Sequence, residues 1–314
     1  MMMAIPMVKH GLIVAVISGA AFWVAGPSAQ AQAMGDPRLL ELDGFAGQVE
    51  IKTAQGAVFD VQIVPGAKLS AKTERAGTLL RVIGPIKKDS SSRCSNYNSN
   101  GRRVKEIKLN GERFGQEDLP RLVVTAPSTI GLRIKHSLIS GRVGDVGGAT
   151  IGLIGCGDFF LGNVAKDLEL NATGSGDVRV GRIGGDLTAS YAGSGNYQTQ
   201  NIGGRAEVSL AGSGNSQIGS VSGAASINLA GSGDIIVASV QGPLEVNVAG
   251  SGDLKVLGGR SRLEANIAGS GTIRHAGTVI DPQINIIGTG DVSVDRVEGT
   301  PTVSKLGSGD FRVD

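Results

Sequence analysis

Residues 174–192 have the sequence GSGDVRVGRIGGDLTASYA, and a second segment of the same kind begins at Gly193 with GSGN. A short glycine turn of this type recurs from Gly155 to Gly307 at the constant step that separates Gly174 from Gly193, without an insertion or deletion. A constant period means that each repeat is one geometric unit stacked on the next. After the first copy, GCGD, the glycines predicted to form the structural turn are Gly174, Gly193, Gly212, Gly231, Gly250, Gly269, Gly288 and Gly307.

Within each repeat, apolar residues alternate with polar ones, which is the period of a β-strand. After the first turn quoted above, Val178 and Val180 are followed by Leu187, Ala189 and Tyr191, each separated from the next by a polar residue or a turn. The same positions are apolar in most later repeats, so we expect them to point inward in every coil. The pattern predicts an all-β fold: a parallel β-helix, or solenoid, with two or three short strands in each 19-residue coil.

A second turn in each coil is marked by glycine at several repeats, but the copies near Ser261 and Ile280 lack it. Glycine accepts backbone conformations that other residues avoid. We therefore expect an irregular coil at these two positions.

Residues 1–33 are predicted to be a signal peptide. An apolar run from Gly11 to Val24 is followed by two small-x-small cleavage patterns, which overlap at Ala31. No second apolar stretch follows. The mature chain is therefore predicted to lack a transmembrane domain and to be exported, to the periplasm, the cell surface or the medium.

The rest of the sequence divides by its periodicity. Residues 34–135 contain strand-like segments without a fixed period, predicted to be an N-terminal β-rich part that caps the rod. Residues 136–314 contain the regular repeats, and a degenerate coil is expected to begin near His136. We expect residues 38–314 to form one continuous structural domain.

The two cysteines, Cys94 and Cys156, are predicted to form a disulfide, because an even pair in an exported chain is usually oxidised. The bond would attach a polar loop, residues 87–103, to the first regular coil. Two free thiols are the alternative. The formal net charge of +2 argues against nucleic acid as the main partner, which would need a concentrated basic face.

An acidic ladder is the first candidate site. One turn position carries Asp or Asn in eight repeats, with Thr272 as an interruption: Asp158, Asp177, Asn196, Asn215, Asp234, Asp253, Asp291 and Asp310. Such side chains can accept hydrogen bonds from turn amides, or stacked carboxylates could bind calcium. We favour the hydrogen bonds, and predict no metal site and no cofactor.

Charged residues offer two further candidates. Some are scattered over the repeats, without a group that recurs on adjacent coils: Arg179, Glu207, Glu245, Lys255, Glu264, Arg274 and Asp295. His136 and His275 lie far apart, and His275 falls in an inward column, so we predict no catalytic residues. A basic segment could contact acidic glycans or anionic lipid headgroups, but we prefer a solvated loop: Lys87, Lys88, Arg93, Arg102, Arg103, Lys105 and Lys108.

The sequence resembles a known family. The opening Leu42-Asp43-Gly44-Phe45, the segment PRLVVTAP at residues 120–127 and the recurrent GSGD turns resemble the putative autotransporter adhesin head GIN domain family, a domain of unknown function. The resemblance covers about residues 40–314. It implies a right-handed parallel β-helix on an exported bacterial protein, and it implies no catalytic residues.

These observations predict a non-enzymatic, adhesin-like scaffold. Its flat outer faces of Ser, Thr, Asn and Gln would bind polysaccharides or cell-envelope components by repeated weak contacts. A polysaccharide lyase or hydrolase built on the same fold is the first alternative. A structural unit that self-associates end to end is the second.

Overall fold

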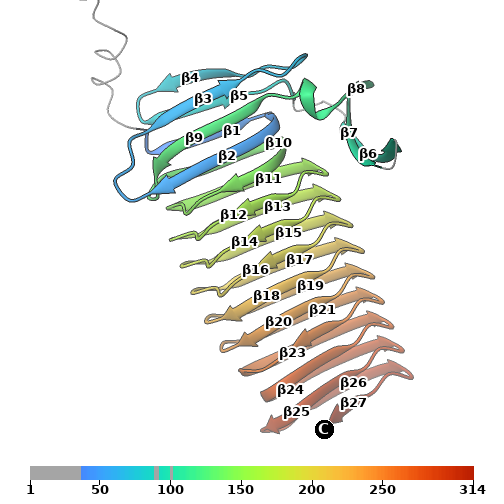
Figure 1. Ribbon diagram of the computed structural model, residues 1–314. Coiled ribbons are helices and arrows are strands. Elements are labelled where there is room, and N and C mark those ends of the chain that lie inside the picture. Colours follow the sequence, from blue (N-terminus) through green and yellow to red (C-terminus); the bar gives the residue numbers. More distant parts are fainter. Residues whose placement is uncertain (1–36, 88–91, 100–101) are drawn as a thin grey trace, which may run out of the picture.

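The computed structural model describes residues 37–87, 92–99 and 102–314; the predicted signal peptide, residues 1–33, lies outside the described residues. The chain forms an elongated rod in which coils are stacked from the N-terminal strands to the C-terminal end (Figure 1). Strands make up 66% of the structure, in a solenoid of about 10 turns with coils of about 19 residues. This confirms the predicted all-β parallel β-helix.

The first wall of the rod contains one strand of each coil, paired in parallel with the strands of neighbouring coils. From the N-terminal end, its strands are β5 (Leu79–Ile83), β1 (Leu39–Asp43), the first part of β10 (Gly131–Val143), β11 (Gly148–Gly155), β13 (Leu168–Gly174), β15 (Leu187–Gly193), β17 (Ala206–Gly212), β19 (Ala225–Gly231), β21 (Leu244–Gly250), β23 (Arg260–Gly269), the second part of β24 (Ile273–Gly288) and β26 (Thr302–Gly307).

The second wall contains the other strand of each coil, which is the shorter one from β12 to β22. From the N-terminal end they are β3 (Asp60–Val64), β9 (Arg121–Pro127), β2 (Ala46–Ala54), the second part of β10, β12 (Phe159–Leu161), β14 (Val178–Val180), β16 (Tyr197–Thr199), β18 (Ser216–Val221), β20 (Ile235–Val240), β22 (Leu254–Val256), the first part of β24, β25 (Val292–Glu298) and β27 (Phe311–Val313). Isolated bridges from Val146 to Val221 add a third, narrower ladder beside this wall.

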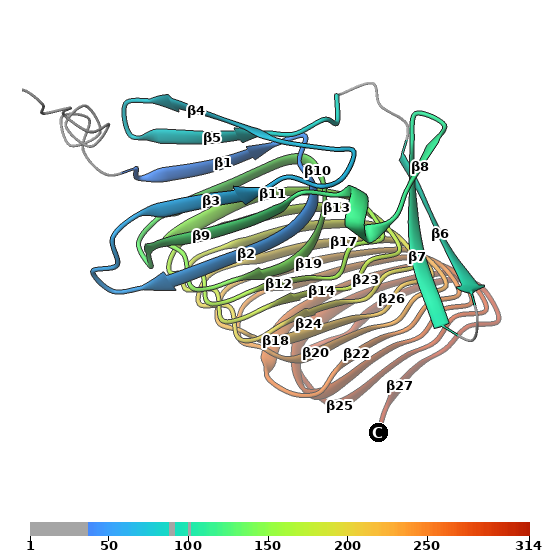
Figure 2. The ribbon, with the colours of Figure 1, turned by 45° about the horizontal axis from the view of Figure 1, so that its top comes forward.

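The N-terminal region extends the rod and then closes its end (Figure 2). Strands β1 and β2 both pair in parallel with β10, so the first coils are built from segments that are distant in sequence. Beyond them, β3 pairs antiparallel with β9, and β4 (Lys72–Ala76) pairs antiparallel with β5. Antiparallel strands interrupt the parallel stacking, which confirms the predicted cap.

The prediction of a polar loop at residues 87–103 was wrong in part. Strands β6 (Ser92–Ser99), β7 (Arg102–Leu109) and β8 (Glu112–Phe114) form a small antiparallel sheet there, followed by the short 3-10 helix η2 (Gln116–Asp118). Ile107, Leu109 and Phe114 pack with Leu138 in a second, small core beneath this sheet. The sheet lies at one edge of the rod's N-terminal end (Figure 1).

The main core is one continuous cluster inside the rod. The inward columns predicted from the repeats are buried except in the last coil, where Val303 is 39% exposed. One of these columns contains residues that are each 2% exposed or less: Phe159, Val178, Tyr197, Ile235, Leu254, Ile273 and Val292. Because every coil contributes a side chain to each column, the interior is filled by aliphatic and aromatic ladders.

The structure departs from the regular coil in the two regions where the sequence predicts an irregular coil. The register shifts between Arg262 and Glu264 in the pairing of β23 with β24, and between His275 and Thr278 in the pairing of β24 with β25. This confirms the irregular coil expected where the second turn lacks glycine. The first coil is also degenerate, as expected, but it is shorter than the regular coils: Gly141 pairs with Phe159, and Ser137 with Leu153.

Candidate functional site

The glycine turn is shaped by close contact between coils. The predicted turn glycines from Gly174 to Gly307 have φ between +122° and +139°, a region that favours glycine. Each one lies against the backbone of the equivalent glycine in the preceding coil. A side chain at this position would therefore collide with backbone, which explains why the turn keeps glycine.

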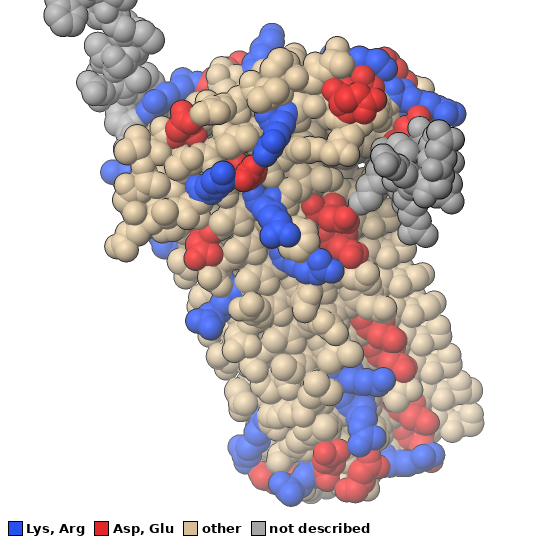
Figure 3. Space-filling model, in the orientation of Figure 1, with Lys and Arg blue, Asp and Glu red and all other residues tan. Residues whose placement is uncertain are grey.

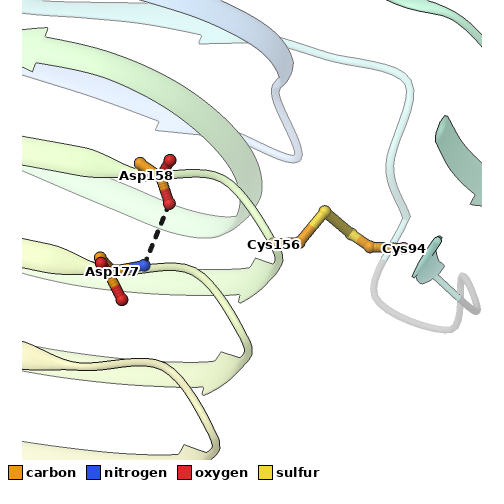
Figure 4. The surroundings of a disulfide bond; sticks show 4 residues. All are labelled: Cys94, Cys156, Asp158 and Asp177. Carbon is orange, nitrogen blue, oxygen red and sulfur yellow. Dashed lines mark hydrogen bonds between the residues drawn. A yellow bond between two sulfur atoms is a disulfide. The ribbon is translucent and has the colours of Figure 1, made fainter. Parts of the chain in front are cut away.

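The acidic ladder is a chain of hydrogen bonds. The backbone N–H of Asp177 donates to Asp158 Oδ1 (3.2 Å; Figure 4), and that of Asn196 donates to Asp177 Oδ1 (3.0 Å). The same contact recurs down the rod, including one from Thr272 N–H to Asp253 Oδ1 (2.9 Å). Asn serves as well as Asp, since only the Oδ1 acceptor is used. This geometry accounts for the ladder without calcium.

Two further ladders of this kind escaped sequence reasoning. Asp167 Oδ1 accepts the N–H of Asp186 (2.9 Å), and Asp186 Oδ1 accepts that of Arg205 (2.7 Å). Asn163 Oδ1 accepts the N–H of Arg182 (2.9 Å) at another turn. The backbone and side-chain hydrogen bonds from Arg205 lower the pKa of Asp186, with the backbone contribution larger. The missed signal was Asp or Asn recurring at the other turns, in fewer copies.

The first wall displays an amide ladder to solvent. Asn228, Asn247, Asn266 and Asn285 occupy one outward column, and from Asn247 onward each Nδ2 donates to the Oδ1 of the preceding Asn at 2.8–3.0 Å. Stacked amides of this kind hold one another in a fixed orientation. Each coil thus presents the same polar group at the strand spacing of about 4.8 Å.

The charged residues are ordered, which corrects the view that they are scattered. On the first wall, Glu207, Glu245 and Glu264 share one outward column, and the last two lie on adjacent strands. On the second wall, Lys255 and Arg274 are direct neighbours. Within the regular coils, these acidic and basic columns therefore lie on different walls of the rod.

A disulfide joins Cys94 on β6 to Cys156 in the first regular turn, with the Cα atoms 5.9 Å apart (Figure 4). The bond attaches the small antiparallel sheet to the rod. Of the basic segment proposed from the sequence, Lys87 and Lys108 are exposed. Lys88 lies outside the described residues, and the remaining members lie on β6 and β7: Arg93, Arg102, Arg103 and Lys105.

The two histidines stay apart, as expected. His275 is fully buried, and its Nε2 lies 3.0 Å from Ser261 Oγ. Burial lowers its pKa because the charged imidazolium is disfavoured inside the rod. His136 adopts a left-handed backbone conformation (φ 47°) on β10. His275 is thus a hydrogen-bonded core residue.

A buried carboxylate organises the N-terminal end of the first wall. The Glu41 side chain, only 1% exposed, contacts Arg81 Nε (2.6 Å), Lys135 Nζ (2.9 Å) and Arg133 Nη1 (3.2 Å). Burial acts to raise the pKa of Glu41, but hydrogen bonds from the three cations outweigh it and lower the pKa. Because three cations surround the Glu41 carboxylate, we assign it a structural role.

The described residues contain no group of three or more His, Cys, Asp and Glu placed to hold a metal ion. No helix among them is long and apolar enough to cross a membrane.

Comparison with protein families gives a direct match. The family described as "putative auto-transporter adhesin, head GIN domain" matches residues 105–260 and 225–314. The chain belongs to this family. The GIN match covers the regular coils and the end of the N-terminal region, where the glycine turns and Asx ladders lie.

Other comparisons add little to the GIN assignment. No curated protein matches the chain. A crystal structure of a protein from Parabacteroides distasonis, described as a "putative lipid binding protein", is similar at 18% sequence identity with a TM-score of 0.40. The match covers 89% of this chain and 93% of that one.

Proposed function

We propose that this GIN protein is an exported, non-enzymatic scaffold that binds polysaccharides or other cell-envelope polymers at the periplasm or cell surface. The observation that carries the proposal is the repeated display of polar groups on the rigid walls of the rod, as in the ladder from Asn228 to Asn285 on the first wall and the pair of Gln198 and Gln217 on the second. A polymer with its own repeat can contact many such groups at once. Weak contacts then add up to useful avidity.

Two features support export. The disulfide between Cys94 and Cys156 is of the kind that persists in oxidising compartments. The family is described as a putative autotransporter adhesin head, and an adhesin acts at the cell exterior. The predicted signal peptide at residues 1–33 agrees with both.

The separation of charges supports binding over catalysis. Glycoside hydrolases use two carboxyl groups that flank one bond, one of them with a raised pKa. Glu245 and Glu264 are adjacent, but both are exposed on a flat wall. The basic residues Lys255 and Arg274 lie on the other wall. This arrangement suits display along a surface.

Co-sedimentation of residues 34–314 with a panel of bacterial and host polysaccharides tests the proposal, with product length measured in the same samples. We expect retention without shortening of the polymer. Shortened products would replace the proposal with the lyase or hydrolase alternative. Absence of retention on every polymer would refute polymer binding.

A further inference from the structure

Two grooves follow one another along the second wall. The first, of about 690 Å³, lies over β2, β9 and the second part of β10, and Arg142 lines it. The second, of about 350 Å³, lies over β14, β16, β18 and β20, and Arg179 lines it. Phe160 on β12 stands between the two arginines in the same outward column, paired in register with both. Lys and Arg side chains gather on the upper part of this face (Figure 3).

The ring of Phe160 holds both arginines. The guanidinium carbon of Arg142 lies 4.8 Å from the ring centroid, and that of Arg179 lies 5.2 Å from it. Both distances are within the range of cation–π attraction. These contacts restrict the two long side chains without using their N–H groups as hydrogen-bond donors, so the guanidinium groups can still donate to an acceptor.

Charge balance leaves the first groove basic, whereas the second groove carries Asp177 and Asp234 beside Arg179. Glu50 in the first groove is shared between Arg121 (2.7 Å) and Lys52 (3.2 Å). Hydrogen bonds from these two cations, Arg121 first, lower the pKa of Glu50. Arg179 lies 3.9 Å from Asp177, at the outer limit of an ion pair, and Arg142 is exposed. The arginine pair can thus accept an external anion.

We propose that Arg142, Phe160 and Arg179 bind the carboxylate groups of an acidic polysaccharide, whose chain runs along the rod from one groove into the other. The inference rests on the proposed function, since it names the class of polymer and the place of contact. The second groove also exposes the amides of Gln198 and Gln217, which are suitable partners for sugar hydroxyls. Among the described residues, no large exposed apolar side chain lines either groove, which disfavours a membrane surface.

The test compares three variants of residues 34–314 on polygalacturonate, with dextran as the neutral polymer and vesicles of anionic lipid as a separate arm. R142Q/R179Q removes both charges, and F160L removes the ring that positions them. R262Q/R296Q is the matched control, since it makes the same substitutions at exposed arginines on the distal coils. Thermal unfolding of each variant checks that the rod is intact.

We expect the wild type and R262Q/R296Q to bind polygalacturonate more tightly than dextran, with a preference that weakens in high salt. R142Q/R179Q should bind it about tenfold more weakly, and F160L should show a smaller loss. Equal binding of both polymers by the wild type, or unchanged binding by R142Q/R179Q, would overturn this site but leave polymer binding intact. If the arginine substitutions weakened binding to vesicles but not to polygalacturonate, the polysaccharide site would be overturned in favour of a lipid surface. No binding to any polymer would refute the proposed function itself.

Discussion

The turn glycines offer a stringent test of how the coils stack. In the middle of the rod, Gly231 has φ +128°, and a Cβ there would overlap the carbonyl oxygen of Gly212 and approach its carbonyl carbon and nitrogen to 3.1 Å. That carbonyl accepts two hydrogen bonds, from Ser232 N–H (2.9 Å) and Gly233 N–H (3.2 Å). The substitution G231A must therefore displace backbone that other contacts hold in place.

The free-energy cost of G231A can be estimated as the sum of two contributions. A positive φ costs a non-glycine residue about 1–2 kcal/mol. Weakening two hydrogen bonds adds about 1 kcal/mol each. The sum of about 3 kcal/mol corresponds to a fall in the melting temperature of roughly 10 °C for a chain of this size.

Gly258 is the matched control within the same rod. A Cβ there would have the carbonyl oxygens of Ala276 and Ala238 as its nearest neighbours, at 3.6 and 3.9 Å, which is ordinary van der Waals contact. We expect G258A to melt at or slightly above the wild-type temperature, because alanine reduces the freedom of the unfolded chain. Thermal unfolding followed by circular dichroism measures both variants. If G231A melted within 2 °C of G258A, by the scale of about 2–4 °C per kcal/mol, the close-contact account would be refuted.

Three further predictions concern the charged, oxidised and buried groups. E41Q should lower the free energy of unfolding by about 2 kcal/mol in urea titrations at pH 7, because three cations lose their buried carboxylate partner. This loss is smaller than the usual cost of breaking a buried ion pair, because the three cations are themselves partly exposed. Because the folded pKa of Glu41 is lowered, the gap between wild type and E41Q should stay constant above about pH 5 and shrink as pH falls through the folded pKa; a gap independent of pH would contradict this. Reduction of the disulfide between Cys94 and Cys156 should speed amide hydrogen exchange in β6 and β7, while the coils from β13 onward stay protected. Equal exchange before and after reduction would show that the bond does not hold the small sheet in place. Since the folded pKa of His275 is lowered, wild type should lose stability as pH falls below about 6.5, and H275Q should not show this loss in the same titration.

Much of the fold was predictable because the repeat is so regular. The step from Gly174 to Gly307 never changes, and a parallel ladder requires equivalent residues to lie directly above one another. The inward columns and the stacking direction follow from that constraint. The N-terminal region lacks this constant step, because β1 and β2 pair with β10 across a long stretch of sequence. Such pairing depends on tertiary packing that no local pattern records.

The candidate sites were less predictable, for a related reason. The basic column on the second wall includes Arg142, which pairs with Phe160 at a step one residue shorter than the regular one. Alignment at the regular step places Phe160 with Gly141 and misses the arginine. The hairpin at β6 and β7 was also missed, since its polar strands resemble a loop in composition.

The register of β10 on β12 is what forms the arginine pair. Gly141 pairs with Phe159, so Arg142 lies in the outward column above Phe160. The residue that the first coil lacks falls after Arg142, because Val146 pairs with Val164 at a step of 18 residues whereas Ala149 pairs with Leu168 at the regular step of 19. A shift of one residue exchanges the two faces of a strand. Gly141 in turn allows close approach of the Val49 backbone, which a side chain would block. Restoring the missing residue by an insertion between Gly144 and Gly148, the turn that follows Arg142, should therefore leave the pair intact. An insertion before Gly141 should turn Arg142 inward and abolish binding of polygalacturonate. Equal binding by the two insertion variants would show that the register of the first coil does not set the site.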